Sequence, residues 1–135
     1  QDHECIMLHR ALYGSLERFM GIYIEHTAGE FPVWIAPLQV MVIPANPKAL
    51  DYANDTTRML KQAGIRAEVD LRDEKMGAKI RDAELAKVPY MLVVGPREAE
   101  AGTVSPRRKG VGQLEAMTRQ AFVDRVLEET RERRR

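Results

Sequence analysis

One stretch, from Arg66 to Gly95, limits the possible fold more than any other part of the 135-residue chain. Residues 66–72 alternate between charged and apolar side chains, which is the period of a half-buried strand. A charged segment follows, in which the apolar residues of 76–83 have the spacing of one helix face. The apolar run Tyr90–Val94 then predicts a strand covered on both faces, with Pro89 just before it because a central strand needs every backbone N–H. This order predicts a βαβ unit.

The composition is that of a globular protein. Hydrophobic residues make up 44% of the chain and charged residues 30%, and no apolar run approaches the roughly 20 residues that cross a bilayer. The chain has no secretory signal, and its single cysteine, Cys5, excludes an internal disulfide. We therefore expect a cytoplasmic protein that does not span a membrane. Because the chain opens with Gln1 rather than Met, we also expect it to be a piece of a longer protein.

Periodicity and end signals predict further elements along the chain. They are a strand at 3–8, a helix at 11–28, a strand at 38–43, a helix between Pro47 and Gly64, short strands at 102–106 and 111–117, and a last helix capped by Thr118. The apolar connector 31–37 contains two prolines, and we place a domain boundary there, between residues 1–37 and 38–135. The second domain is predicted to be α/β, with a mixed sheet covered by helices.

The N-terminal part contains residue types that bind metals and anions. His3, Cys5 and His9 are metal-ligand types, but a structural zinc site normally needs a fourth ligand, so a self-contained site is not favoured. Gly14 lies within the predicted helix, where glycine costs about 1 kcal/mol and indicates either a close backbone approach or loose packing. Arg18 could hold an anion through its planar fork or form a surface ion pair, and the spacing favours neither.

The predicted sheet domain contains two further groups of polar residues. Charged residues at 70–75 follow a strand end, where open α/β sheets place ligand sites, although a solvated loop has the same composition. Glu98 and Arg107 come after the next strand, and these side chains can accept from and donate to base edges. The chain has no glycine-rich phosphate loop, no GxSxG elbow and no convincing catalytic Cys–His pair. Taken alone, these residues indicate an α/β ligand-binding module.

Longer motifs resemble a known family. The segment HRALYGSLERF at 9–19, followed by FPVWIAP at 31–37, resembles motif 3 and the exit from the catalytic domain of the class II threonyl-tRNA synthetases. The segments DLRDEKMG at 70–77 and VPYMLVVG at 88–95 resemble the C-terminal anticodon-binding domain of the same family. The resemblance covers nearly the whole chain and implies its C-terminal portion.

The resemblance implies roles for residues before the connector. The parent enzyme would use ATP and Mg²⁺ to activate threonine, would charge threonine tRNA and would work as a homodimer. His9 matches the last protein ligand of a Zn²⁺ ion that binds threonine, and Cys5 does not match a ligand. Arg18 matches a catalytic arginine that contacts ATP, and Ser15 matches the wall of the same pocket. Since motifs 1 and 2 are absent, we expect this chain alone to be inactive and to bind no cofactor stably.

The resemblance also implies roles in reading the anticodon stem-loop of threonine tRNA. Glu98 and Arg107 match residues that contact anticodon bases. Asp73 stands where some relatives have Asn and therefore offers only acceptors. Lys87 stands where some relatives have Arg and cannot copy a bidentate fork.

Two other readings remain open at this point. One is a non-catalytic accessory protein that uses an anticodon-binding-like α/β fold to bind nucleic acid or protein. The other is a free-standing small-molecule or phospho-acceptor α/β module built around Asp70 and Asp73. A phospho-acceptor would need an aspartate at a central strand end, whereas we expect Asp70 to be poorly buried on an alternating strand.

Overall fold

The βαβ unit forms the middle of the fold in the computed structural model, which describes residues 5–134. Its parts are the strand β2, the helix α3 and the strand β3, with the bounds expected from the sequence to within a few residues. The elements in chain order are α1 (Leu16–Thr27), β1 (Val40–Pro44), the 3-10 helix η1 (Pro47–Ala49), α2 (Leu50–Gln62), β2 (Ala67–Val69), α3 (Met76–Leu85), β3 (Tyr90–Val94), α4 (Pro96–Ala101), β4 (Thr103–Arg108), β5 (Gly112–Gln113), β6 (Met117–Thr118) and α5 (Arg119–Glu132).

The strands form one mixed sheet, as predicted. Their order is β2-β1-β3-β4-β5, and β6 pairs with β4. The first three strands are parallel, whereas β4 runs antiparallel to β3. The strand β3 is central, and both Met91 and Leu92, which point to opposite faces, are fully buried. The apolar run at 90–94 is thus confirmed as a strand covered on both sides.

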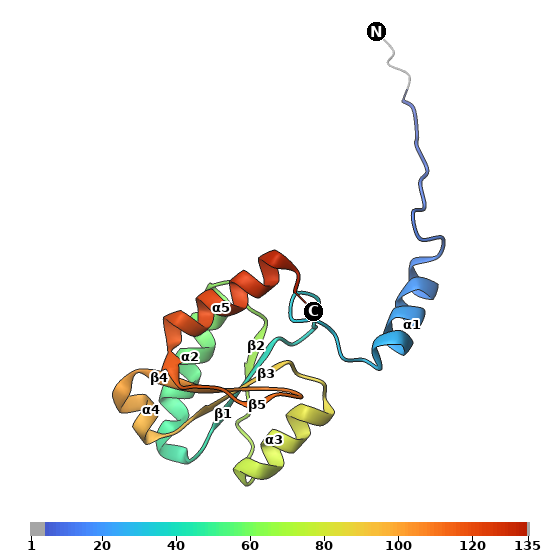
Figure 1. Cartoon of the computed structure of the whole chain (residues 1–135). Coiled ribbons are helices and arrows are strands. Elements are labelled where there is room, and N and C mark those ends of the chain that lie inside the picture. Colours follow the sequence, from blue (N-terminus) through green and yellow to red (C-terminus); the bar gives the residue numbers. More distant parts are fainter. Residues whose placement is uncertain (1–4, 135) are drawn as a thin grey trace.

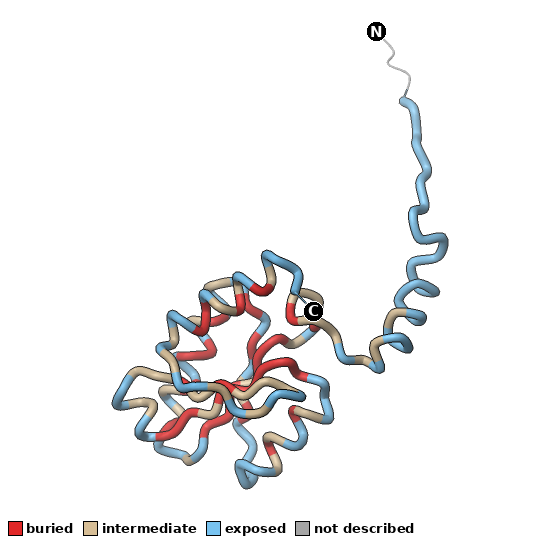
Figure 2. Tube along the Cα trace, viewed as in Figure 1, coloured by how far each residue is buried: buried red, intermediate tan, exposed pale blue. Residues whose placement is uncertain are grey.

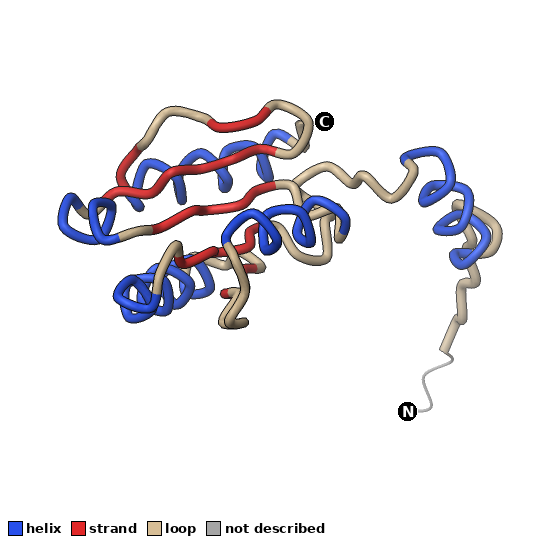
Figure 3. The backbone as a smooth tube through the Cα atoms, turned by 90° about the horizontal axis from the view of Figure 1, so that it is seen from below, coloured by secondary structure: helices blue, strands red, loops and turns tan. Residues whose placement is uncertain are grey.

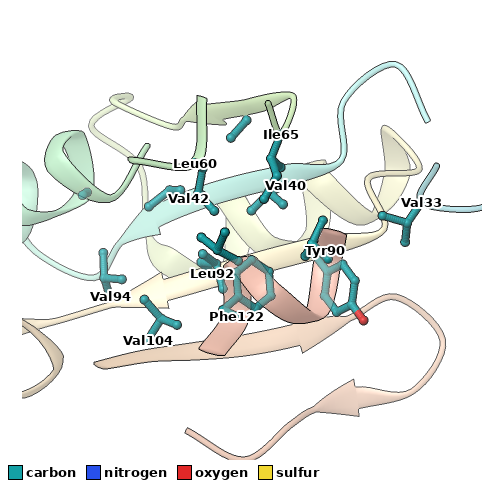
Figure 4. Packing of buried hydrophobic residues seen from close by; sticks show 14 residues of the cluster. Val33, Val40, Val42, Leu60, Ile65, Tyr90, Leu92, Val94, Val104 and Phe122 are labelled. Atoms are coloured by element: carbon teal, nitrogen blue, oxygen red, sulfur yellow. The ribbon is translucent and has the colours of Figure 1, made fainter. Parts of the chain in front are cut away.

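Helices cover the two faces of the sheet unequally (Figure 1). The larger hydrophobic cluster joins α2 and α5 to one face, where Leu60 and Phe122 pack against Leu92 (Figure 4). The smaller cluster lies on the opposite face, where Ala83 of α3 packs with Met91. Since α3 contacts mainly β1, the opposite face is less covered over β4.

Several helix ends follow the expected signals. The Thr118 hydroxyl accepts a hydrogen bond of 3.2 Å from the Ala121 N–H and so caps α5, as predicted. Pro47 begins η1, which continues directly into α2. The helix α4 was not predicted, although Pro96 at its first position and Glu98 at its third are typical of a helix start.

The N-terminal part differs from the sequence prediction. The helix α1 begins at Leu16, five residues late, because Gly14 has a left-handed φ of 71° and Ser15 is the N-cap. Residues 5–8 form no strand, since no other strand lies beside them to complete a ladder, and residues 3 and 4 lie outside the described part. Gly14 is therefore not inside the helix.

The helix α1 stands away from the sheet, beyond an extended connector (Figure 3). None of its residues is buried, and most of them are exposed (Figure 2). Leu12, just before the helix, is 71% exposed and Leu16 is 60% exposed. Among residues 5–134, no helix is both long enough and apolar enough to cross a membrane.

The connector 31–37 packs onto the sheet domain. Val33 is 2% exposed and belongs to the larger hydrophobic cluster. Gln39 Nε2 donates a 2.7 Å hydrogen bond to the Val33 carbonyl, and Arg66 Nε donates one of 2.9 Å to the Ala36 carbonyl. The folded unit thus extends back into the connector, and a domain boundary inside 31–37 stays a prediction.

Candidate functional site

Glu98 is held at the start of α4, just beyond the end of the central strand β3. Its Oε2 atom accepts a 3.0 Å hydrogen bond from the Gly95 N–H, and its Oε1 atom accepts one of 3.1 Å from the Ser105 hydroxyl. Burial alone would raise the pKa of Glu98, but hydrogen bonds from its own backbone, Gly95 and Ser105 outweigh burial and lower that pKa. Glu98 is therefore an ionised, oriented hydrogen-bond acceptor.

Arg107 lies on β4, opposite Met91 of the central strand. Directly opposed residues of an antiparallel pair point to the same face, so Arg107 lies on the α3 side of the sheet. Its Nε atom is 3.5 Å from Oε1 of Glu84 in α3 and, within the described chain, has no hydrogen-bond partner. The guanidinium is thus held beside α3 by charge, with hydrogen-bonding capacity left over.

Glu98 contacts the strand that carries Arg107. Ser105, which binds Glu98, is two residues from Arg107 on β4, so both of their side chains lie on the same face. We call this face the β4–α3 surface. It consists of Glu84, Lys87, Glu98, Ser105 and Arg107. Sequence reasoning missed Ser105 and Glu84, although the two-residue spacing of Ser105 from Arg107 was a usable signal.

Asp73 and Lys87 lie at opposite ends of α3. Asp73 is exposed in the loop after β2, before α3 begins. Lys87 follows the end of α3 in a left-handed conformation, and its Nζ atom is 3.3 Å from Oε1 of Glu30. Lys87 therefore joins the end of α3 that also carries Glu84, whereas Asp73 lies apart from it.

Asp70 has a different environment from the one expected. It is buried, at 7% exposure, so the expectation that it would be poorly buried was wrong. Its carboxylate accepts hydrogen bonds from Arg72 at 3.0 Å and 2.6 Å, and these hold the pKa of Asp70 below its usual value. Lys79 donates to the backbone carbonyl of Asp70 rather than to the carboxylate. Because β2 is an edge strand, this arrangement lacks the central carboxylate of a phospho-acceptor site.

The residues matched to the parent's ATP and zinc sites are exposed around α1. The Ser15 hydroxyl caps the helix and donates a 3.1 Å hydrogen bond to Glu17, and Arg18 points into solvent. His9 lies in the segment before α1, and its Nε2 atom is 3.1 Å from the Met7 sulfur. Among residues 5–134, no three His, Cys, Asp or Glu side chains gather where they could hold a metal ion.

The mixed sheet with helices on both faces defines a small α/β domain. The anticodon binding domain family matches residues 39–129, and the chain belongs to that family. A solved structure, the RNA binding domain of threonyl-tRNA synthetase from Cryptosporidium parvum Iowa II, has a TM-score of 0.82 and is 31% identical. The match covers 85% of this chain and 29% of that chain, and it confirms the predicted fold class.

Curated relatives that match nearly the whole chain are threonine–tRNA ligases. The chain is 55% identical to a threonine–tRNA ligase of Thermus thermophilus over 99% of its length, which is 20% of that relative. It is 52% identical to a threonine–tRNA ligase of Aquifex aeolicus over 95% of its length, again 20% of that relative. The predicted resemblance to threonyl-tRNA synthetases is thus confirmed, and the chain spans about one fifth of these curated relatives.

Proposed function

We propose that this chain binds the anticodon stem-loop of threonine tRNA as the C-terminal part of a threonine–tRNA ligase. The observation that carries the proposal is that Glu98 of α4 accepts a hydrogen bond from Ser105, which lies two residues from Arg107 on the same face of β4. The 31% identity to an RNA binding domain of the same enzyme supports it.

The chemistry of the surface suits single-stranded bases. Bases in RNA loops are splayed out, and their edges can be read by hydrogen bonds. An ionised Glu98 accepts from base amino groups, whereas Arg107 donates to ring nitrogens and carbonyl oxygens. Lys87 would add a charged contact, and Asp73 would add acceptors from the far end of α3.

We assign the activation of threonine and the charging of tRNA to a longer protein that would contain this chain. In that protein, residues 1–37 would belong to the catalytic domain, and Arg18 and Ser15 would contact ATP bound with Mg²⁺. His9 would supply one of several ligands to a zinc ion. The whole enzyme would be a cytoplasmic homodimer that charges tRNA with threonine. The chain alone would not catalyse this reaction, because α1 has none of the remaining site around it.

The test is a titration of the chain with the threonine tRNA anticodon stem-loop and with a loop-substituted stem-loop, at one fixed salt concentration. We expect tighter binding to the native loop. Glu98→Ala and Arg107→Ala should each cost about 1–3 kcal/mol of binding free energy and reduce the preference. Glu98→Gln serves as a second variant, because it keeps an oxygen to cap α4 while it removes the charge.

Two matched variants control for general charge effects. Glu100→Ala removes a carboxylate from the exposed side of the same short helix, and Arg58→Ala removes a guanidinium from α2, across the sheet. Both should leave the loop preference unchanged. Equal binding of the unmodified chain to both loops would overturn the proposal, and so would unchanged binding in both Glu98→Ala and Arg107→Ala.

A further inference from the structure

Glu30, which lies between α1 and the connector, forms ion pairs with two lysines of the sheet domain. Its Oε1 atom is 3.3 Å from Nζ of Lys87 and also accepts a hydrogen bond from Nζ of Lys109. Two ammonium groups thus share one carboxylate oxygen. The side-chain hydrogen bonds from Lys109 and then Lys87 hold the pKa of Glu30 below its usual value, so the carboxylate stays ionised.

The two lysines are positioned by their backbones independently of Glu30. The Lys87 N–H donates to the Glu84 carbonyl at 3.1 Å, in a left-handed turn after α3. The Lys109 N–H donates to the Pro89 carbonyl at 3.0 Å, and the Lys109 side chain is only 20% exposed. Glu30, by contrast, is 57% exposed, so it can leave at the small cost of a surface ion pair.

The lysines line an open groove beside the β4–α3 surface. The groove encloses about 400 Å³, and its lining includes two further basic side chains, Arg108 and His26. Lys109 follows Arg107 by two residues, at the turn between β4 and β5. Basic side chains therefore continue from the face proposed to contact bases into this groove, whose lining also includes Glu30.

We propose that Lys87 and Lys109 form a binding site for a backbone phosphate of the RNA, and that the Glu30 carboxylate occupies this site in the unbound chain. The inference rests on the proposed function, since it requires that the chain binds RNA. It adds to that function a contact that is independent of base sequence. Ammonium groups bind phosphate as point charges. The RNA must displace Glu30, so Glu30 lowers the affinity for every RNA that uses the site.

The test compares Glu30→Gln with Glu25→Gln, which removes an exposed carboxylate from α1 that forms no ion pair in the described chain. Glu30→Gln should tighten binding of the native and the loop-substituted stem-loops alike, by about threefold, because it removes two weak ion pairs that the RNA must otherwise break. Lys109→Ala should weaken both and reduce the slope of log K against log salt by about 0.7. When Glu30→Gln is added to the double variant Lys87→Ala, Lys109→Ala, the affinity for the stem-loops should not increase.

The outcomes separate this inference from the proposed function. If Glu30→Gln and Glu25→Gln change affinity equally, or if the gain persists without both lysines, the phosphate site is refuted. A different outcome is that no variant distinguishes the native from the loop-substituted stem-loop, while Glu30→Gln alone binds both more tightly than the unmodified chain. In that case the phosphate site stands and the proposed anticodon preference fails.

Discussion

The Tyr90 hydroxyl donates a 2.8 Å hydrogen bond to the buried carboxylate of Glu129, and so ties the central strand to the last helix. Arg108 Nη1 contacts both groups, at 3.2 Å from the hydroxyl and 3.0 Å from the carboxylate. In Figure 4 the Tyr90 hydroxyl points out of the apolar cluster, while its ring packs edge-on against Phe122. A polar contact thus orients α5 where apolar packing ends.

Tyr90→Phe tests this contact. The change removes the donor and leaves a buried carboxylate with fewer partners, so it should lower the free energy of unfolding by about 1–2 kcal/mol. Urea unfolding followed by circular dichroism measures the loss. Tyr13→Phe, at a residue 65% exposed, is the control and should be neutral. Equal midpoints for the two variants would contradict a stabilising role for the hydroxyl.

Leu92→Ala tests the position of the core. Leu92 is fully buried on the face covered by α2 and α5, so its truncation leaves a cavity and should cost about 2–5 kcal/mol. Leu12→Ala removes the same atoms from a residue 71% exposed and should change stability by less than about 0.5 kcal/mol. Thermal or urea unfolding of the two variants is the measurement. A comparable loss in both would mean that residues before α1 are packed in solution.

Thr118→Ala tests the cap of α5. Loss of the hydroxyl leaves the Ala121 N–H without its acceptor and should cost about 1 kcal/mol of stability. Thr118→Ser keeps the acceptor and should retain most of the stability. The unfolding midpoints of the two variants provide the comparison, and an equal loss in both would assign the effect to the methyl group instead.

Asp70 predicts a pH dependence of stability. Hydrogen bonds from Arg72 hold the pKa of Asp70 below its ordinary value of 3.8, so the folded chain binds the proton less tightly than the unfolded chain. The stabilisation is therefore complete above this ordinary value and is lost as the pH falls through the lower pKa of the folded chain. Asp70→Asn should cost about 1 kcal/mol at pH 7, since Arg72 is half exposed.

Urea unfolding at pH 7 and near pH 2 checks the direction in which the stabilisation by Asp70 changes with pH. The difference between Asp70→Asn and the unmodified chain should shrink at the lower pH. Glu74→Gln, at an exposed position in the same loop, should show no such difference at either pH. A constant difference across the pH range would show that the carboxylate charge is not the source of the stabilisation.

Much of the sheet domain was predictable because local patterns match what the fold requires. The apolar run at 90–94 became the central strand, and the Thr118 cap marked the start of α5. The helix α4 was not predicted, although Pro96 and Glu98 are typical of a helix start. Four of the proposed site residues, Glu98, Arg107, Asp73 and Lys87, could be named from the family resemblance, and their roles stay predictions.

Apart from the short helix α4, the sequence by itself determined the order of strands and helices after residue 38, because periodicity, caps and turn residues act over a few positions. Only the tertiary structure decided which residues distant in the sequence contact each other. It buried Asp70 against Arg72, aligned Arg107 with Glu84 of α3, and placed Glu30 between Lys87 and Lys109. It also left α1 exposed despite its apolar stripe, because an amphipathic pattern predicts a helix face without supplying the surface that covers it.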